Sequence, residues 1–206
     1  VHLPIILNAS TGKKMSKSIG NVISPNTIIN DYKNYTDFGE DVLRFVLIHE
    51  VSNFEDGDIT NESIRSTYIT YLQNGIGNQV NRILKLTNTY LENSEVVEIV
   101  EEAKNKKLND GFRDFLNNFK LNEAIHFITQ KQKELDEYIQ KTEPFKLLKS
   151  QNDNDKNKGN EILKKCLFDL VYISHHLFFF MPRTSIAIYN LTKENKMPEK
   201  PLFRRL

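Results

Sequence analysis

The chain has 206 residues, of which 39% are hydrophobic and 27% charged, so it can bury the core of one domain or of a domain with a small module. The 28 lysines and arginines exceed the 27 aspartates and glutamates by one, which excludes a global basic field and leaves any RNA contact to local clusters. The single cysteine, Cys166, excludes an internal disulfide, and its apolar neighbours predict a buried, unreactive thiol in a reducing, cytoplasmic compartment.

The N-terminal 25 residues contain the one predicted strand. An apolar run from His2 to Leu7 forms it, and a polar loop rich in lysine and serine follows and ends at Pro25. A strand without a partner leaves backbone groups unsatisfied, and no second strand is predicted. This strand and the initial Val1 together indicate a fragment whose upstream sequence is missing.

Every later element is predicted to be helical. A first helix covers 39–49, and an acidic loop with Gly57 covers 53–60. Thr60 is a suitable N-cap for a long helix over 61–92. Positions three or four residues apart predict one buried stripe on this helix: Ile64, Tyr68, Leu72, Ile76, Val80, Ile83, Thr87 and Leu91.

The second half is predicted to contain further helices and one polar, mobile loop. The predicted helices are 112–119, 121–139, a short one restarting at 142–145, 161–180 and 182–191, and the loop is 150–160. The most apolar stretch, Cys166 to Met181, is too short to span a membrane and contains Asp169, so no membrane association is expected. Helices joined by short loops predict a mainly α fold, with a first domain over 1–60 and an α-helical bundle over 61–206.

The segment from Gly12 to Asn21 has the composition of an anion-binding loop. Three lysines and two serines lie within six residues, in the order Lys-Lys-Met-Ser-Lys-Ser. Lysine binds phosphate as a point charge, serine hydroxyls donate to phosphate oxygens, and the flanking glycines let such a loop close over a nucleotide. A solvated, lysine-rich surface loop is the alternative for this composition.

Residues Lys14-Met15-Ser16-Lys17-Ser18 resemble, letter for letter, the KMSKS signature of the class I aminoacyl-tRNA synthetases. The resemblance implies that this loop binds ATP, which is used with Mg²⁺ as a substrate. It implies that Lys17, and next to it Lys14, are the catalytic contacts to the transition state. It also implies that residues 1–60 are the end of a Rossmann catalytic core with a stem-contact region.

A polar ridge is predicted on the exposed face of the long helix. At about 100° per residue, and with Asn74 at zero, Asn78 falls at about 40° and Arg82 at about 80°. Lys85 falls at about 20°, whereas the buried stripe lies between about 120° and 280°. Asparagine can read a base edge as donor and acceptor, arginine can bind phosphates or bases, and two glycines in this stretch let another chain approach the backbone. An ordinary solvated helix face is the alternative.

The segment from Leu72 to Arg82 resembles the helix with which methionyl-tRNA synthetases read a CAU anticodon. In that family two asparagines and an arginine stand four residues apart. The resemblance therefore implies that Asn74, Asn78 and Arg82 bind the anticodon.

Three further segments resemble the same family. Phe38 to Phe45 resembles the segment that follows the KMSKS loop, and Phe54 to Ile59 resembles an aspartate-glycine-aspartate turn, for which an ordinary acidic turn is the alternative. Thr142 to Leu147 resembles a second anticodon-binding element, in which the family usually has tryptophan where this chain has Phe145. A phenyl ring can still stack on a base, and a role in the core is the equal alternative.

Together the resemblances imply the C-terminal half of a synthetase that activates methionine with ATP and esterifies it to methionine tRNA, the partner with a CAU anticodon. The HIGH signature and the methionine pocket would lie upstream, so the isolated chain is expected to be inactive. Two alternatives stay open. One is a stand-alone tRNA-binding module without catalysis, and the other is a class I synthetase for cysteine, leucine, isoleucine or valine.

No metal site is expected within the chain. There is no cysteine cluster, and the adjacent His175 and His176 point to different helix faces, which makes them a poor chelate. They are predicted to be core or edge residues. A monomer is the expected assembly.

Overall fold

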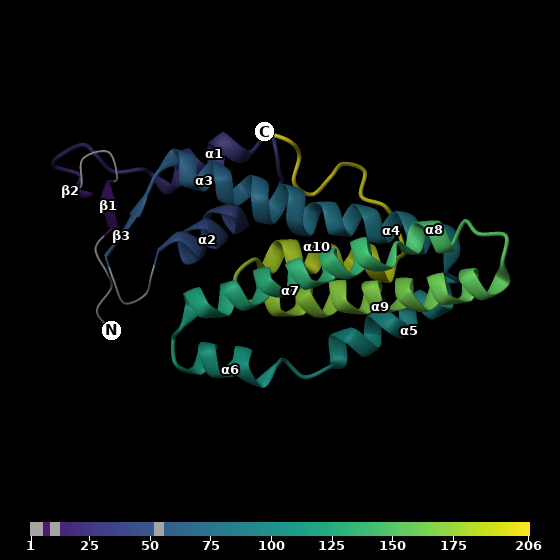
Figure 1. Ribbon diagram of the computed structural model, residues 1–206. Coiled ribbons are helices and arrows are strands. Elements are labelled where there is room, and N and C mark those ends of the chain that lie inside the picture. Colours follow the sequence, from purple (N-terminus) through teal and green to yellow (C-terminus); the bar gives the residue numbers. More distant parts are fainter. Residues whose placement is uncertain (1–5, 9–12, 52–55) are drawn as a thin grey trace.

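The computed structural model describes residues 6–8, 13–51 and 56–206, and its architecture is mainly α, as predicted. Parts of three predicted features lie outside the described residues, namely His2 to Ile5, Gly12, and Phe54 with Glu55. Figure 1 shows a small sheet at one end of the molecule and an elongated bundle of helices that extends away from it.

Three short strands form the sheet, in the order β2-β1-β3. β1 (Ile6–Asn8) pairs antiparallel with β2 (Lys13–Lys14) and parallel with β3 (Gly57–Ile59). Two predictions are therefore wrong, because the N-terminal strand has partners within the chain and part of the predicted acidic loop is a strand. β3 buries one residue, Ile59, and a strand of this length is too short for an alternating pattern to reveal it.

Two helices connect the sheet to the bundle. α1 (Pro25–Tyr32) begins with proline. Proline has no backbone N–H, which costs no hydrogen bond in the first turn because N–H groups there have no acceptor within the helix. The sequence pattern does not predict α1, because it buries only Ile28 and Tyr32. α2 (Gly39–Glu50) confirms the predicted helix at 39–49.

Residues of α2 hydrogen-bond to the C-terminal half of the chain. The buried carboxylate of Asp41 accepts hydrogen bonds from the Thr184 backbone N–H at 2.7 Å and from its hydroxyl at 2.8 Å. Arg44 Nε donates to the Phe180 carbonyl at 2.8 Å. These contacts join residues on either side of the predicted domain boundary at residue 60, and that boundary stays a prediction.

The long helix predicted at 61–92 begins where expected, because the Thr60 hydroxyl caps it by accepting a hydrogen bond from the Ser63 N–H at 2.9 Å. It consists of three consecutive segments: α3 (Asn61–Thr67), η1 (Tyr68–Gly77) and α4 (Asn78–Tyr90). Every residue of the predicted stripe is buried, which confirms the inward face.

η1 is a π-helical segment with a break at Gly75, whose φ of −83° and ψ of −111° lie outside the helical region. The prediction of one uninterrupted α-helix is therefore wrong in its middle. Gly77 permits close packing at this point, because a Cβ there would lie 2.8 Å from the Leu72 carbonyl oxygen and 3.3 Å from the Phe203 ring. Phe203 of the same chain thus makes the close approach at Gly77, while a Cβ at Gly75 would lie 3.6 Å from Gln132 Oε1; the approach of another chain to these glycines stays a prediction.

The rest of the described chain adds the helices of the bundle. They are α5 (Asn93–Asn105), α6 (Asp110–Asn117), α7 (Leu121–Thr142), α8 (Pro144–Leu147), α9 (Asp153–Leu177) and α10 (Pro182–Lys193). α9 is the central helix and packs against α4, α5, α7, α8 and α10 (Figure 1). The predicted helices in this half are confirmed, and α5 is an addition, because its buried face is only Val96, Val100 and Ala103 in a segment rich in glutamate.

The mobile loop predicted at 150–160 is wrong over most of its length, because α9 begins at Asp153. Asn152 caps the helix by accepting a hydrogen bond from the Asn154 N–H at 2.9 Å. Acidic residues in the first turn suit the positive end of the helix dipole. Gly159 lets α9 pack closely on α8, since a Cβ there would lie 3.0 Å from Leu148 Cγ. Because residues 150–160 are almost all polar, the Asn152 cap and the acidic first turn of α9 were not recognised as signals of a helix start.

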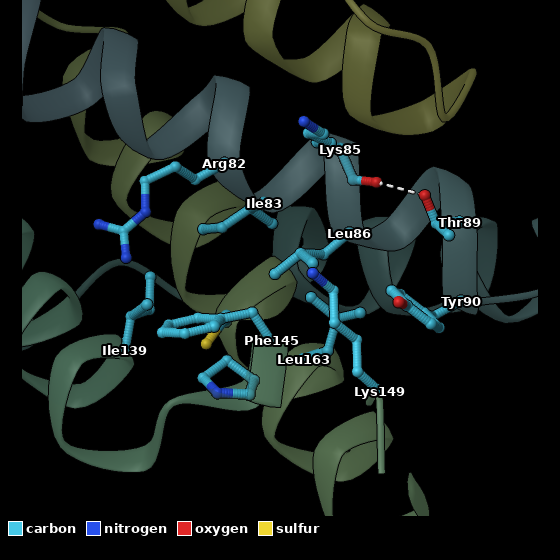
Figure 2. A pocket seen from close by; sticks show the side chains of 12 residues that line it. Arg82, Ile83, Lys85, Leu86, Thr89, Tyr90, Ile139, Phe145, Lys149 and Leu163 are labelled. Atoms are coloured by element: carbon cyan, nitrogen blue, oxygen red, sulfur yellow. Dashed lines mark hydrogen bonds between the residues drawn. The ribbon is translucent and has the colours of Figure 1, made fainter. Parts of the chain in front are cut away.

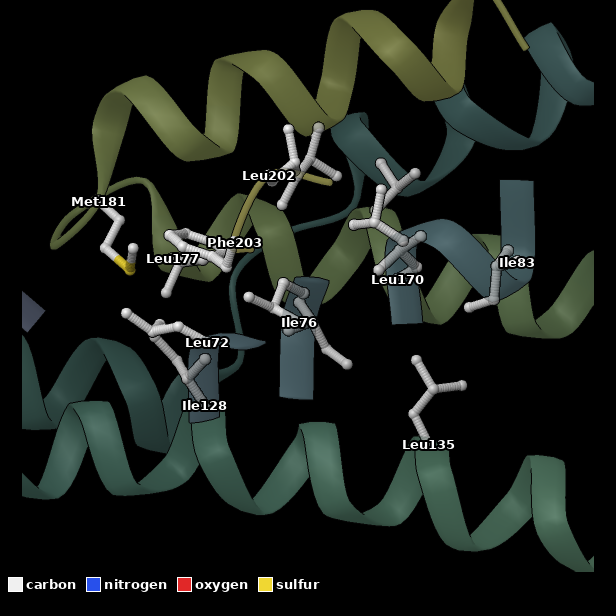
Figure 3. Packing of buried hydrophobic residues seen from close by; sticks show 14 of the residues in the cluster. Leu72, Ile76, Ile83, Ile128, Leu135, Leu170, Leu177, Met181, Leu202 and Phe203 are labelled. Atoms are coloured by element: carbon white, nitrogen blue, oxygen red, sulfur yellow. The ribbon is translucent and has the colours of Figure 1, made fainter. Parts of the chain in front are cut away.

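The core runs along the bundle between η1, α4, α7 and α9 (Figure 3). The side chains drawn there include Leu72, Ile76, Ile83, Ile128, Leu135, Leu170, Leu177, Met181, Leu202 and Phe203. Cys166 is 1% exposed, as predicted, and burial raises the pKa of its thiol to about 12, so the thiol stays protonated and unreactive at neutral pH.

The C-terminal segment after α10 returns along the long helix and hydrogen-bonds both to this helix and to the segment between α1 and α2. Thr36 Oγ1 donates to the Leu202 carbonyl at 2.8 Å, and the Arg204 N–H donates to the Tyr35 carbonyl at 2.7 Å. The hydroxyl of the buried Tyr68 donates to the Arg204 carbonyl at 2.9 Å.

The helices within residues 6–8, 13–51 and 56–206 are those of a bundle with an apolar interior and polar outer faces. None of the helices there is both long and apolar enough to cross a bilayer. In the same ranges no three His, Cys, Asp or Glu side chains gather in a way that could hold a metal ion. His176 is a buried residue whose Nε2 accepts a hydrogen bond from the Asn109 N–H at 3.2 Å, and burial lowers its pKa.

Candidate active-site loop and nucleic-acid interface

The predicted ATP-binding loop is a compact turn that leaves β2. Asn21 closes it, because its Oδ1 accepts a hydrogen bond from the Ser16 N–H at 2.8 Å and its Nδ2 donates to the Lys14 carbonyl at 3.2 Å. The N–H groups of Ile19 and Gly20 both donate to the Ser16 carbonyl at 3.1 Å. Gly20 has a φ of +71°, a left-handed conformation that glycine adopts without strain.

The loop exposes both charged and apolar side chains, since Ile19 is 60% exposed. Lys14, Lys17 and Ser18 are exposed, whereas Met15 is half-buried against the core. The hydroxyls of Ser16 and Ser18 hydrogen-bond to each other at 2.8 Å. The arrangement presents two ammonium groups and two hydroxyls on a turn that is closed by hydrogen bonds, and such a group of donors can bind phosphate oxygens.

The predicted polar ridge lies on the outer face of the long helix. Asn74, Asn78 and Lys85 are exposed, and Arg82 is half-buried. Within α4 the expected angular spacing of Asn78, Arg82 and Lys85 holds. Asn74 stands before the break at Gly75 in the more loosely wound η1, so its calculated position relative to Asn78 does not hold. The Asn74 Oδ1 accepts a hydrogen bond from Gln73 Nε2 at 3.1 Å.

Arg82 makes an ion pair that the sequence pattern does not predict. Its guanidinium NH1 lies 3.6 Å from Asp136 Oδ1 on α7, with 35% of the arginine side chain and 28% of the aspartate side chain exposed. Burial raises the pKa of Asp136, while the Gln79 amide and the Arg82 charge act in the opposite direction. A hydrophobic pattern cannot reveal this contact, because the two residues come from separate helices.

A pocket of about 440 Å³ lies between α4, α8 and α9 (Figure 2). Arg82 and Phe145, predicted from separate segments, both line it, and in Figure 2 Arg82 extends toward Phe145 and Ile139 while the Lys85 side chain points away from them. Aliphatic walls complete the pocket: Ile83, Leu86, Ile139 and Leu163. A half-buried ring beside a guanidinium can stack on a flat ligand whose polar edge meets the arginine.

The predicted residues do not all meet in this pocket. Asn74 and Asn78 are not among its lining residues. Lys149 and Tyr90 line it and were not singled out from the sequence. Lys149 follows Phe145 by four residues, and that spacing on a short helical turn is the signal that could have identified it.

Comparison with known proteins gives the family. Residues 7–84, which include the loop and most of the polar ridge, match the family described as tRNA synthetases class I (M). The chain belongs to this family.

Curated methionine–tRNA ligases align with this chain at low identity. The methionine–tRNA ligase of Ureaplasma parvum serovar 3 is 30% identical over 151 residues, which are 69% of this chain and 28% of that protein. The methionine–tRNA ligase of Clostridium acetobutylicum is 29% identical over 184 residues, which are 86% of this chain and 27% of that protein. The chain thus spans little more than a quarter of the length of these relatives.

Solved structures from the class I (M) family share the fold. Free methionyl-tRNA synthetase of Mycobacterium tuberculosis superposes with a TM-score of 0.73 at 18% identity, over 90% of this chain and 41% of that one. The same enzyme in complex with methionyl-adenylate gives 0.72 at 21% identity, over 97% of this chain and 43% of that one.

Proposed function

We propose that this chain is part of a methionine–tRNA ligase that activates methionine with ATP and esterifies it to a methionine tRNA. The names of the curated relatives support methionine over the other amino acids of class I. The chain would supply two elements, an ATP-binding loop and an anticodon-binding surface, in a first domain over 1–60 and a second over 61–206. Since it spans little more than a quarter of its relatives, the isolated chain is proposed to be inactive.

The loop is proposed to act in the activation step. When the methionine carboxylate attacks the α-phosphate of ATP, negative charge grows on that phosphate and on the departing pyrophosphate. Lys17 and Lys14 are exposed on the turn and would meet this charge, with Mg²⁺ accompanying ATP as part of the substrate. Contacts that form only in the transition state lower the barrier without tightening substrate binding.

The anticodon-binding surface is proposed to consist of Asn74, Asn78, Arg82 and Phe145. The observation that carries this proposal is the shared pocket, because Arg82 and Phe145 lie far apart in sequence and line one cavity. A base would stack on the Phe145 ring and present its edge to Arg82, while the exposed asparagines would read neighbouring bases of a CAU sequence. A stand-alone RNA-binding module would use the same surface but would not need the Lys17 loop.

The proposal extends to the compartment and the assembly. A buried, free cysteine is compatible with a reducing compartment such as the cytoplasm. We also propose a monomer without membrane attachment as the simplest assembly.

Substitution of Asn78 or Arg82 by alanine is expected to weaken binding of an RNA hairpin with a CAU loop by about 10- to 100-fold, because each loses hydrogen bonds worth about 1–3 kcal/mol to a base. Fluorescence anisotropy with a labelled hairpin measures this change. Asn26→Ala and Arg113→Ala are matched controls on α1 and α6, since both residues are exposed, and they should leave the affinity unchanged.

A hairpin with a different loop sequence separates recognition from general RNA affinity. The proposal requires that wild-type protein prefers CAU and that the two variants lose this preference. Equal binding of both hairpins by the wild-type chain would rule out anticodon recognition on this surface.

A further inference from the structure

A buried polar cluster lies between α4 and α7, beside the proposed anticodon-binding pocket. Gln79 is fully buried and Gln132 is 3% exposed, and Gln79 Nε2 donates to the Gln132 backbone carbonyl at 2.7 Å. Asp136 lies one turn further along α7 from Gln132. Burying polar side chains lowers the free energy of unfolding unless they are hydrogen-bonded, so a functional role for this cluster is worth considering.

Three side-chain atoms of this cluster accept or donate no hydrogen bond within the described part of the chain: Gln79 Oε1, Gln132 Nε2 and Asp136 Oδ1. The Asp136 oxygen instead faces the guanidinium of Arg82 across 3.6 Å. This separation is longer than a hydrogen bond, and with 35% of the Arg82 side chain and 28% of the Asp136 side chain exposed, solvent screens part of the attraction between the two charges. The Asp136 carboxylate therefore lies between the Gln79 amide, which does most to counter the rise in its pKa caused by burial, and the arginine that lines the pocket, which is its facing charge.

Arg82 needs such a partner if it is to discriminate between ligands. An arginine side chain free in solvent samples many rotamers and binds any phosphate by charge alone. A guanidinium that pairs with a carboxylate of the protein on one side presents its remaining N–H groups in a restricted direction, which favours one base edge. In Figure 2 the Arg82 side chain is extended toward Phe145 and Ile139, as this account requires.

We propose that Asp136 is a positioning residue that holds the Arg82 guanidinium in the pocket, so that Arg82 reads a base edge instead of binding phosphate without selectivity. This inference rests on the proposed function, and it adds a residue from α7 to a surface otherwise assigned to η1, α4 and α8. Asp136 itself touches no ligand in this scheme.

The charged and titratable surroundings of Asp136 come from three helices. α4 contributes Arg82 as the facing charge, with Lys85 exposed beyond it. On α9, the Cys166 thiol lines the same pocket as Arg82, and it stays neutral because burial raises its pKa to about 12. On α7 the ion pair of Lys133 and Glu137 is exposed, at 3.9 Å. Since burial raises the pKa of Asp136, its charge is lost at a higher pH than that of an ordinary aspartate as the pH falls.

The pairing can be tested without any RNA. The side-chain Nε–Hε signal of Arg82, assigned by its disappearance in Arg82→Lys, is followed by NMR as the pH is lowered. The signal should shift with the protonation of Asp136 in the wild-type chain and stay constant in Asp136→Asn. Glu137→Gln neutralises an exposed carboxylate on the same helix and should leave the titration unchanged. A signal that titrates identically in Asp136→Asn would overturn the pairing.

A double-mutant cycle then tests positioning. Asp136→Asn keeps the size of the side chain and should reduce the preference for a CAU hairpin over a changed hairpin by about 10-fold, with unchanged or tighter binding of the changed hairpin. In an Arg82→Ala background the same substitution should have no further effect. A purely structural role would instead lower affinity for both hairpins and would persist without Arg82.

The two experiments distinguish failure of the inference from failure of the proposed function. If the wild-type chain shows no preference for CAU while the Arg82 signal still reports Asp136, the anticodon proposal fails and the pairing stands. If the preference is present but Asp136→Asn leaves it intact, positioning by Asp136 is wrong.

Discussion

Replacement of Lys17 by alanine in the full-length protein is expected to slow methionine activation by about 100- to 1,000-fold. The loss of one preorganised contact to transition-state charge has this effect on kcat in enzymes where it has been measured. Lys17 is exposed on the turn and is absent from the core, so the substitution should leave thermal unfolding unchanged. Methionine-dependent exchange of pyrophosphate into ATP measures the activation step.

A control lysine tests whether the effect depends on position. Lys33 is also exposed but follows α1, so Lys33→Ala should exchange pyrophosphate at the wild-type rate. If Lys17→Ala behaves like Lys33→Ala, the loop takes no part in activation. The proposed module without catalysis would then become the better explanation of the chain.

Replacement of Phe45 by alanine is expected to lower the free energy of unfolding by about 3–5 kcal/mol, because it removes a large buried ring and leaves a cavity. Phe45 is fully buried on α2, with its ring 5.7 Å from that of His49 and 6.2 Å from that of Tyr71 on η1. Urea unfolding followed by circular dichroism measures the change. Phe178, at 46% exposed, provides a matched Phe→Ala control that should cost less than about 1 kcal/mol.

A small effect of Phe45→Ala would mean that α2 does not pack against η1 in solution. That result matters for function, because α2 also holds Asp41 and Arg44, which bind the α9–α10 turn and the start of α10. Through these contacts the sheet and its loop are joined to the bundle that carries the pocket.

Periodic features were predictable from the sequence, because repetition over many residues averages out local exceptions. The buried stripe of the long helix is the clearest case, since every one of its residues faces the core. Thr60 was predictable from local chemistry, as an N-cap needs only its own hydroxyl and a nearby N–H. The Lys14–Ser18 loop was recognised from its residue order, which no periodic argument supplies.

Features that depend on distant partners were not predictable. The strand Gly57–Ile59 is defined by its pairing with β1 and not by its own pattern. The break at Gly75 accompanies packing of Phe203 against the neighbouring Gly77, and Phe203 lies at the far end of the chain. The ion pair of Arg82 with Asp136 likewise requires α4 and α7 to be side by side.

The prediction of a mobile loop at 150–160, where α9 begins, was wrong for a different reason. The signals were local, in the Asn152 cap and the acidic first turn, but the low complexity of 150–160 was interpreted as disorder. A segment of polar residues can still form a helix that packs on the protein when a neighbouring segment offers apolar side chains to it. Here Leu148 of the preceding turn packs against Gly159.

The central claim is that the surface formed by Asn74, Asn78, Arg82 and Phe145 reads an anticodon, and chemical-shift mapping of the labelled chain with RNA hairpins tests it most directly. With a CAU hairpin, the largest shifts should fall on these four residues and on their neighbours in the pocket, and a hairpin with a changed loop should leave them small. Shifts of equal size with both hairpins, or shifts centred on the opposite face around α5 and α10, would contradict the claim.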